Sequence, residues 1–392
     1  MHICSALTAN SDVETVSTNL CDRLGRSLGN HSADLLVLFV TTALKENFQG
    51  IVEAVEKRLK PKRLLACTAE SVLGEQREVE KQPAAAALAM SLPGVTVDAF
   101  HFADEEWPEL LGESGTLLAR LEAGADLRAF LMLGDPYSTP IVQLLDACSM
   151  LFPNAPIIGG MASGMREPGE ARLAINGQIF NSGLVGLSVA GPIQVDCVVS
   201  QGCRPIGQPF VITKAHQNVI EQLGGKPAIV ALEEMLTGLS LVDRQLLQTR
   251  QLQVGRVIDE GKGNFGRGDF LIRTIMGVQR ESGGIAIGDM VRPGQTVQFH
   301  VQDARAADED LRLLLQGEIM LANTPAGALM FSCNGRGTQL FGAPDHDIRA
   351  LHQVLGDVPV AGFFCAGEFG PVGGRNFIHG QTASLALFRK PE

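Results

Sequence analysis

The sequence contains few of the residues on which several classes of protein depend. Its 392 residues include one tryptophan and one tyrosine, and 43 acidic residues outnumber 32 lysines and arginines, for a net charge of −11. Nucleic-acid binding relies on basic stripes and on aromatic side chains that stack on bases. The composition therefore indicates no nucleic-acid partner and favours a small molecule or a protein.

Long apolar runs are also missing. No stretch approaches the roughly 20 consecutive apolar residues that a membrane helix needs, so we expect no membrane insertion. The segment 1–16 has neither the basic start nor the apolar centre of a secretory signal. These two absences predict a cytoplasmic protein.

The eight cysteines are scattered, and none belongs to a Cys-x-x-Cys pair, which favours reduced thiols and argues against a disulfide framework or a structural zinc. The sequence has no phosphate-binding loop, zinc-protease helix or nucleophile elbow. Its one Gly-x-Gly-x-x-Gly string, at 261–266, precedes an expected strand, whereas a dinucleotide site requires a following helix. We therefore expect no metal site, no catalytic residues and no enzyme activity.

A pattern of about sixty residues occurs three times. Each copy begins with an apolar run, at 35–41, 129–135 and 328–334, and continues through an amphipathic stretch to a second apolar run that breaks into small residues, at 63–71, 156–164 and 359–370. Each copy closes on an alternating strand, at 86–92, 183–189 and 382–388. A repeated supersecondary unit implies a repeated way of burying one apolar face.

The pattern predicts strand–helix–strand–hairpin units and an α/β fold with mixed sheets in two domains. In the first unit we expect a strand at 35–40, a helix at 47–59 and a strand at 63–67; in the second, a strand at 130–133, a helix at 141–151 and a hairpin through Asn176-Gly177. A helix at 110–121 should link the two. We expect domains at 1–194, with two repeat units, and at 195–392, with short alternating strands, a helix at 308–320 and the third unit.

Two copies share a Cys-x-x-Glu string at the second apolar run, Cys67 with Glu70 and Cys365 with Glu368. A structural interpretation, in which the cysteine is a small core residue and the glutamate caps a turn, stands beside a functional one. A nearby carboxylate raises a thiol pKa and depletes the thiolate, so it argues against a catalytic cysteine.

The third unit carries the densest cluster of polar and glycine residues. Its first strand ends in Asn334 and Arg336, and its second leads into a glycine-rich hairpin. Carboxyl ends of parallel strands lie at one edge of a sheet, where ligands tend to bind. We therefore expect a small-molecule site formed by Asn334, Arg336, Phe363, Cys365, Glu368, Arg375, Asn376 and His379. Arg336 would hold a ligand carboxylate and Glu368 an amine, unless the two side chains neutralise each other.

Several strings resemble one known family. The segment 362–388, GFFCAGEFGPVGGRNFIHGQTASLALF, is similar to the signature of the FIST C-terminal region, as are 201–213 and 270–304, while the two leading units resemble the FIST N-terminal domain. The resemblance covers nearly the whole chain. It implies an intracellular sensory module for signal transduction that binds a small ligand such as an amino acid, with a signalling protein as a possible partner.

Two alternatives remain open. Some FIST relatives bind haem and respond to nitric oxide, which makes His216, His300 and His379 conceivable haem ligands, although we expect no cofactor. The other alternative is a cysteine-dependent enzyme that uses Cys365 or Cys333. The absence of a nucleophile motif favours a binding module, because catalysis needs a base oriented on its nucleophile.

Overall fold

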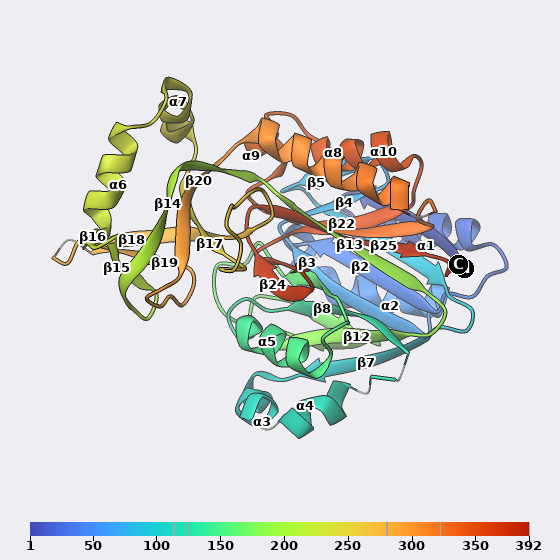
Figure 1. Ribbon diagram of the computed structural model, residues 1–392. Helices are drawn as coiled ribbons and strands as arrows, with labels where there is room; N and C mark the ends of the chain where they lie inside the picture. Colours follow the sequence, from blue (N-terminus) through green and yellow to red (C-terminus); the bar gives the residue numbers. More distant parts are fainter. Residues whose placement is uncertain (113, 122, 125, 280, 322, 392) are drawn as a thin grey trace. The chain divides into compact units, whose positions relative to one another are not determined.

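The structure, a computed structural model, describes all residues except 113, 122, 125, 280, 322 and 392 (Figure 1). The chain forms two compact units: residues 1–199, 311–378 and 382–392, and residues 200–310 with 379–381. Both mix helices and strands, so the predicted α/β class with mixed sheets is confirmed.

The first repeat is longer than the sequence pattern indicated. Its elements are β1 (His2–Ala9), α1 (Val13–Leu28), β2 (Leu35–Thr41), η1 (Thr42–Asn47), α2 (Phe48–Leu59), β3 (Arg63–Ala69), the hairpin β4 (Ser71–Gly74) and β5 (Arg77–Glu80), and β6 (Ala84–Ser91). The predicted helix is confirmed as α2, which buries Phe48, Ile51, Val52 and Val55 at spacings of three and four. The leading β1 and α1 were not foreseen.

The second repeat follows the same order. It comprises β7 (Thr96–Phe102), η2 (Asp104–Glu106), α3 (Trp107–Gly112), α4 (Ser114–Leu121), β8 (Leu127–Gly134), α5 (Ile141–Leu151), β9 (Ile157–Met161), the hairpin β10 (Leu173–Ile175) and β11 (Gln178–Phe180), and β12 (Leu184–Ala190). The predicted linking helix at 110–121 corresponds to α3 and α4, which lie on either side of residue 113, a position outside the described residues. The predicted hairpin turn is confirmed, because Asn176 and Gly177 both have positive φ, 48° and 78°.

The third repeat contains the second unit as an insertion. It starts with β13 (Gln194–Gln201) and resumes with α8 (Ala304–Leu321), β21 (Gly327–Cys333), α9 (Gly337–Phe341), α10 (His346–Leu355), β22 (Val360–Cys365), the hairpin β23 (Glu368–Val372) and β24 (Arg375–His379), and β25 (Thr382–Arg389). The expected boundary at 194/195 thus falls where this repeat begins. All three repeats nevertheless lie mainly in the first compact unit.

Exchange of hairpins between the repeats explains this grouping. The three six-stranded sheets have the orders β1-β6-β2-β3-β10-β11, β7-β12-β8-β9-β23-β24 and β13-β25-β21-β22-β4-β5. Each repeat therefore adds its hairpin to the sheet of another repeat: β10 pairs with β3, β23 with β9, and β4 with β22. Because every sheet is completed by a second repeat, the third repeat is bound to the first two.

One apolar core lies between the inner faces of the three sheets. It includes Phe39, Leu133 and Phe331 from the first strands and Leu65, Ile158 and Phe363 from the second strands. The outer face of each sheet packs against its own helices, α1 and α2 on the first, α3 to α5 on the second, and α10 with the second half of α8 on the third. The parallel pairs therefore converge on a common core.

The second unit is a small barrel with two helices. Its elements are β14 (Cys203–His216), β15 (Val219–Leu223), β16 (Lys226–Pro227), α6 (Ala228–Thr237), α7 (Leu241–Thr249), β17 (Leu252–Val257), β18 (Phe270–Gln279), β19 (Gly284–Ile287) and β20 (Thr296–Gln302). Pairing of β14 with β15 closes the sheet. The string at 261–266 lies between β17 and β18, as the sequence predicted.

Candidate functional site

The carboxyl ends of the three parallel strand pairs border one cavity. β2 pairs with β3, β8 with β9 and β21 with β22, and each pair ends at matching residues: Thr41 with Ala69, Gly134 with Met161, and Cys333 with Cys365. The segments that follow these ends line a cavity of about 930 Å³ in the first unit. Cavities of this size, at this edge of α/β sheets, commonly bind small molecules.

Every repeat contributes to the cavity wall. The residues that follow the first strands include Thr42, Pro136 and Asn334, and those that follow the second strands include Glu70, Ser163 and Ala366. The remaining lining residues are Ala43, Lys45, Lys81, Tyr137, Ala162, Gly164, Met165, Arg166 and Glu170. The site is therefore a joint product of the three repeats rather than of the third alone.

Ser163 ties the strand ends together. Its hydroxyl accepts a hydrogen bond from the backbone N–H of Glu70 at 2.8 Å and donates to the carbonyl of Phe364. One side chain from the second repeat thus joins the first and the third. Gly164, next to it, has a φ of +82°, and a Cβ there would lie 2.9 Å from the Cα of Glu70, so a glycine is needed at this close approach.

Five charged side chains line the cavity. Lys45 lies 3.0 Å from Glu170, and Lys81 lies 3.7 Å from Glu70. Glu170 also accepts from the backbone N–H groups of Arg166 and Glu167, at 2.8 and 3.3 Å. These N–H groups, with Lys45, lower the pKa of Glu170 to about 2. The fifth charge is the exposed Arg166.

The only tyrosine of the chain lies at the cavity, on the turn after β8. Asp135 holds this turn by accepting from the Ser138 hydroxyl at 2.6 Å. The indole of Trp107, the only tryptophan, donates to the carbonyl of Ser138 at 2.7 Å. Tyr137 itself is half exposed. A single tryptophan is therefore in direct contact with a turn that lines the site.

Asn334 is the one predicted site residue that lines this cavity. Its backbone N–H donates to the carbonyl of Cys365 at 3.0 Å, and its side-chain Oδ1 is buried without a partner among the described residues. An unpaired buried acceptor is costly. Asn334 therefore has an unsatisfied acceptor next to the cavity, covered by protein atoms.

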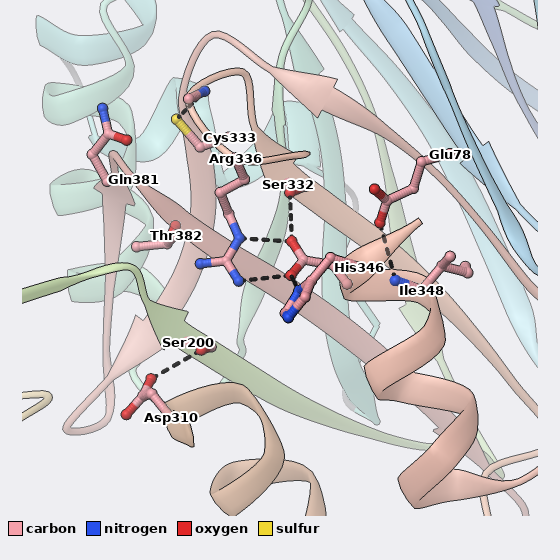
Figure 2. A network of polar contacts seen from close by, with 12 residues as sticks. Glu78, Ser200, Asp310, Ser332, Cys333, Arg336, His346, Ile348, Gln381 and Thr382 are labelled. Atoms are coloured by element: carbon pink, nitrogen blue, oxygen red, sulfur yellow. Dashed lines mark hydrogen bonds and ion pairs between the residues drawn. The ribbon is translucent and has the colours of Figure 1, made fainter. Parts of the chain in front are cut away.

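Arg336 is buried, and its guanidinium already forms an ion pair with another side chain of the protein. Its Nε and Nη2 donate to the two carboxylate oxygens of Asp347 at 2.7 and 2.8 Å (Figure 2). Ser332 and His346 add further contacts to the same carboxylate. Burial opposes ionisation of Asp347, but Arg336 outweighs it and holds the pKa of that carboxyl below its usual range. Arg336 is thus paired with Asp347, and not with Glu368 as the alternative prediction had it.

Glu368 and Cys365 are completely buried beside this network. Glu368 accepts from the Thr382 hydroxyl at 2.8 Å, yet burial raises its pKa to about 8, so the carboxyl is protonated at neutral pH. Burial, aided by Glu368, also raises the pKa of the Cys365 thiol well above its ordinary value. Glu78 is a third such group, with a pKa raised to about 8 by burial and by Asp347. Glu368 and Glu78 are therefore neutral acids beside the buried ion pair of Arg336 and Asp347.

The other four predicted site residues lie elsewhere. Phe363 is in the central core, with its ring 4.9 Å from Phe39 and 5.7 Å from Phe331. Asn376 binds the backbone of Ile157 and Ala155, at the amino end of β9 and so opposite the cavity. Arg375 pairs weakly with Asp146 at 3.7 Å. His379 is buried and groups with the second unit.

The shared Cys-x-x-Glu string does not mark equivalent positions. Ala69 and Cys365 are the partners of the last residues of β2 and β21, so Glu70 corresponds to Ala366 and not to Glu368. Cys67 lies two residues before the end of its strand, whereas Cys365 is the last residue of its strand. Glu70 therefore lies at the cavity and Glu368 in the interior. Applying the strand-end argument to all three copies would have pointed to Thr42, Glu70, Pro136 and Ser163, which the sequence analysis missed.

The structure offers poor geometry for the haem alternative at His300. That ring is buried, lies 4.7 Å from the ring of Phe270 and has Gly255 directly against it, so it leaves no room for a porphyrin. Burial lowers its pKa to about 4. His216 is exposed at the end of β14. Within the described part of the chain, no group of three or more His, Cys, Asp or Glu side chains is placed to hold a metal ion.

None of the helices in the described residues is long and apolar enough to cross a membrane. All eight cysteines are free thiols, and six of them are buried.

Comparison with known proteins finds similar sequences and a matching family. An uncharacterised protein of Mycobacterium tuberculosis (strain H37Rv) is 39% identical over 99% of this chain and 100% of its own length, and one of Mycobacterium bovis is 36% identical over 99% of both. A solved cyanuric acid hydrolase aligns over 100% of both chains, with a TM-score of 0.30 and 10% identity. Residues 34–226 match the FIST N domain and residues 228–371 the FIST C domain. The chain therefore belongs to the FIST family, whose domains are sensory domains of signal transduction.

Proposed function

We propose that this chain is a sensory module that binds a small amino-acid-like ligand in the cavity shared by the three repeats. The observation that carries the proposal is the convergence of all three pairs of strand ends on one space of about 930 Å³. A ligand there would contact every repeat at once. Its binding would therefore change how the repeats hold together, which is what a sensor requires.

The polar groups of the cavity suit a zwitterion. Lys81 and Arg166 offer donors to a carboxylate, while Glu70 and the unpartnered Oδ1 of Asn334 offer acceptors to an ammonium group. This assignment moves the carboxylate-binding role from Arg336, which is engaged by Asp347, to residues that line the open space. Asn334 stays in the proposed site, where the sequence analysis expected it.

We also propose that the chain is not a cysteine-dependent enzyme. The Cys365 thiol is buried and its pKa is raised well above the ordinary value, so thiolate is scarce and access is closed. Cys333, its register partner on β21, lies beside the buried Arg336 and the protonated Glu368 rather than on the cavity wall.

A ligand screen tests the binding proposal directly. The intrinsic fluorescence of Trp107 should change on titration with amino acids and small carboxylates, because its indole holds the turn that carries Tyr137. Calorimetry then gives the affinity. Asn334→Ala should weaken binding of any hit by about 3- to 30-fold, as expected for one lost hydrogen bond.

Asn154→Ala is the matched control, since Asn154 is exposed and lies outside the cavity. Equal affinities of a hit for the wild type and for Asn334→Ala would place its site elsewhere. A complete absence of hits among amino and carboxylic acids would contradict the proposal itself.

A further inference from the structure

The five charged side chains that line the cavity differ in how tightly they are paired. Glu170 is fully engaged: two backbone N–H groups and Lys45 surround its carboxylate at 2.8 to 3.3 Å. These contacts close the loop that presents Arg166. Lys45 and Glu170 therefore neutralise each other and are occupied by holding the loop.

Glu70 and Lys81 form a much looser pair. Their closest atoms are 3.7 Å apart, beyond hydrogen-bonding distance, and the side chains are 32% and 66% exposed. Solvent-exposed pairs of this kind contribute little, because water and salt screen them. A ligand can separate Glu70 from Lys81 at small cost and then interact with both.

In the part of the chain that the structure describes, Arg166 is the one cation of this cavity without an opposite charge beside it. Among the residues that the structure describes, its guanidinium has no ion-pair partner. Three cations and two carboxylates thus give the cavity a net charge of +1, although the chain as a whole carries −11. A planar guanidinium fork matches the geometry of a carboxylate.

From this imbalance we propose that the ligand is an acidic amino-acid-like molecule with one ammonium group and at least two carboxylates. One carboxylate pairs with Arg166, the second with Lys81, and the ammonium group with Glu70 and Asn334. The inference rests on the proposed function and adds the net charge of the ligand. A neutral amino acid would leave one of the two available cations without a partner.

Three small molecules with carbon chains of equal length separate the contribution of the second carboxylate from that of the amine. L-Glutamate has two carboxylates and an amine, L-glutamine lacks the second carboxylate, and glutarate lacks the amine. By calorimetry at low ionic strength we expect glutamate to bind the wild type about 3- to 10-fold more tightly than either of the others, the range for partly exposed ion pairs. Added salt should reduce that preference.

Arg166→Gln should weaken glutamate binding by about 3- to 10-fold and so remove most of the preference for glutamate over glutamine. Arg292→Gln is the matched control, since Arg292 is exposed in the second unit and outside this cavity. Thermal unfolding should be the same for all three proteins, because Arg166 is exposed.

Distinct results would overturn the two proposals. If glutamine or a basic amino acid binds at least as tightly as glutamate and the binding depends on Asn334, the sensor proposal stands and the charge inference is wrong. A preference for glutamate that survives in Arg166→Gln also contradicts the inference. If glutamate, glutamine and glutarate all fail to bind at millimolar concentration, the charge inference fails, and if no other acid binds either, so does the proposed function.

Discussion

The guanidinium of Arg336 and the carboxylate of Asp347 form a two-point contact at 2.7 and 2.8 Å, and their side chains are 0% and 1% exposed. Arg336 precedes α9 and Asp347 lies in the first turn of α10, so the pair fixes the connection between β21 and its helices. A buried pair of this kind is weak evidence for net stability, but removal of one partner leaves an isolated buried charge.

Arg336→Ala should therefore lower the free energy of unfolding by about 3 to 5 kcal/mol, measured by urea denaturation. Arg58→Ala is the control, because Arg58 and Asp22 form an exposed pair, and should cost less than about 1 kcal/mol. Ligand affinity of the folded Arg336→Ala protein should be unchanged. Lost affinity with little change in melting temperature would instead show that Arg336 binds the ligand.

The protonated Glu368 should make stability depend on pH. Its pKa rises from 4.5 to about 8 on folding, so the native state holds the proton more tightly than the unfolded chain. This contribution is complete below pH 4.5 and is lost as the pH rises towards 8, by up to about 1.4 kcal/mol per pH unit. Glu368→Gln should reduce the slope of stability against pH between 5 and 8, with Glu78 responsible for a similar remaining slope. An unchanged slope would contradict the assignment.

The Cys365 thiol should resist alkylation in the native protein. It is completely buried, and its raised pKa leaves little thiolate at neutral pH. Iodoacetamide labelling followed by peptide mass analysis should modify Cys365 in the unfolded chain but not in the folded one. Full reaction of this thiol in the native protein below about pH 7 would overturn the claim.

Phe363 should matter for stability and not for ligand specificity. Its ring packs against those of Phe39 and Phe331 in the core between the three sheets. Phe363→Ala should cost about 3 to 5 kcal/mol of unfolding free energy. The half-buried Phe377 provides a control whose removal should cost less. If Phe363→Ala weakened ligand binding without loss of stability, a binding role for Phe363 would be favoured.

Local sequence patterns predicted most of the elements and the repeat. The spacing of Phe48, Ile51, Val52 and Val55 identified α2, because a helix repeats every 3.6 residues and buries one face. Asn176-Gly177 identified a hairpin turn, because both residues accept positive φ. The leading strands β1, β7 and β13 escaped notice, and the third is separated from its helix by the inserted barrel.

The edge of the sheet that borders the cavity was predicted in part. Strand ends are readable from sequence, so Asn334 was placed correctly at the edge where the first strand of its repeat ends. Lys81 and Arg166 belong to loops in other repeats, and nothing local to the third repeat indicates them. The ion pair between Arg336 and Asp347 at the same edge could not be predicted either, because no local sequence pattern marks Asp347 as the partner of Arg336.

The sequence by itself determined the family, the repeated unit and the secondary structure, because these depend on interactions between residues close along the chain. Only the tertiary structure decided which hairpin completes which sheet and which strand ends meet. β4 pairs with β22 across more than half of the chain, and Ser163 joins Glu70 to Phe364. Such contacts depend on how all three sheets pack around one core, and the periodicity of a short segment carries no information about its distant partner.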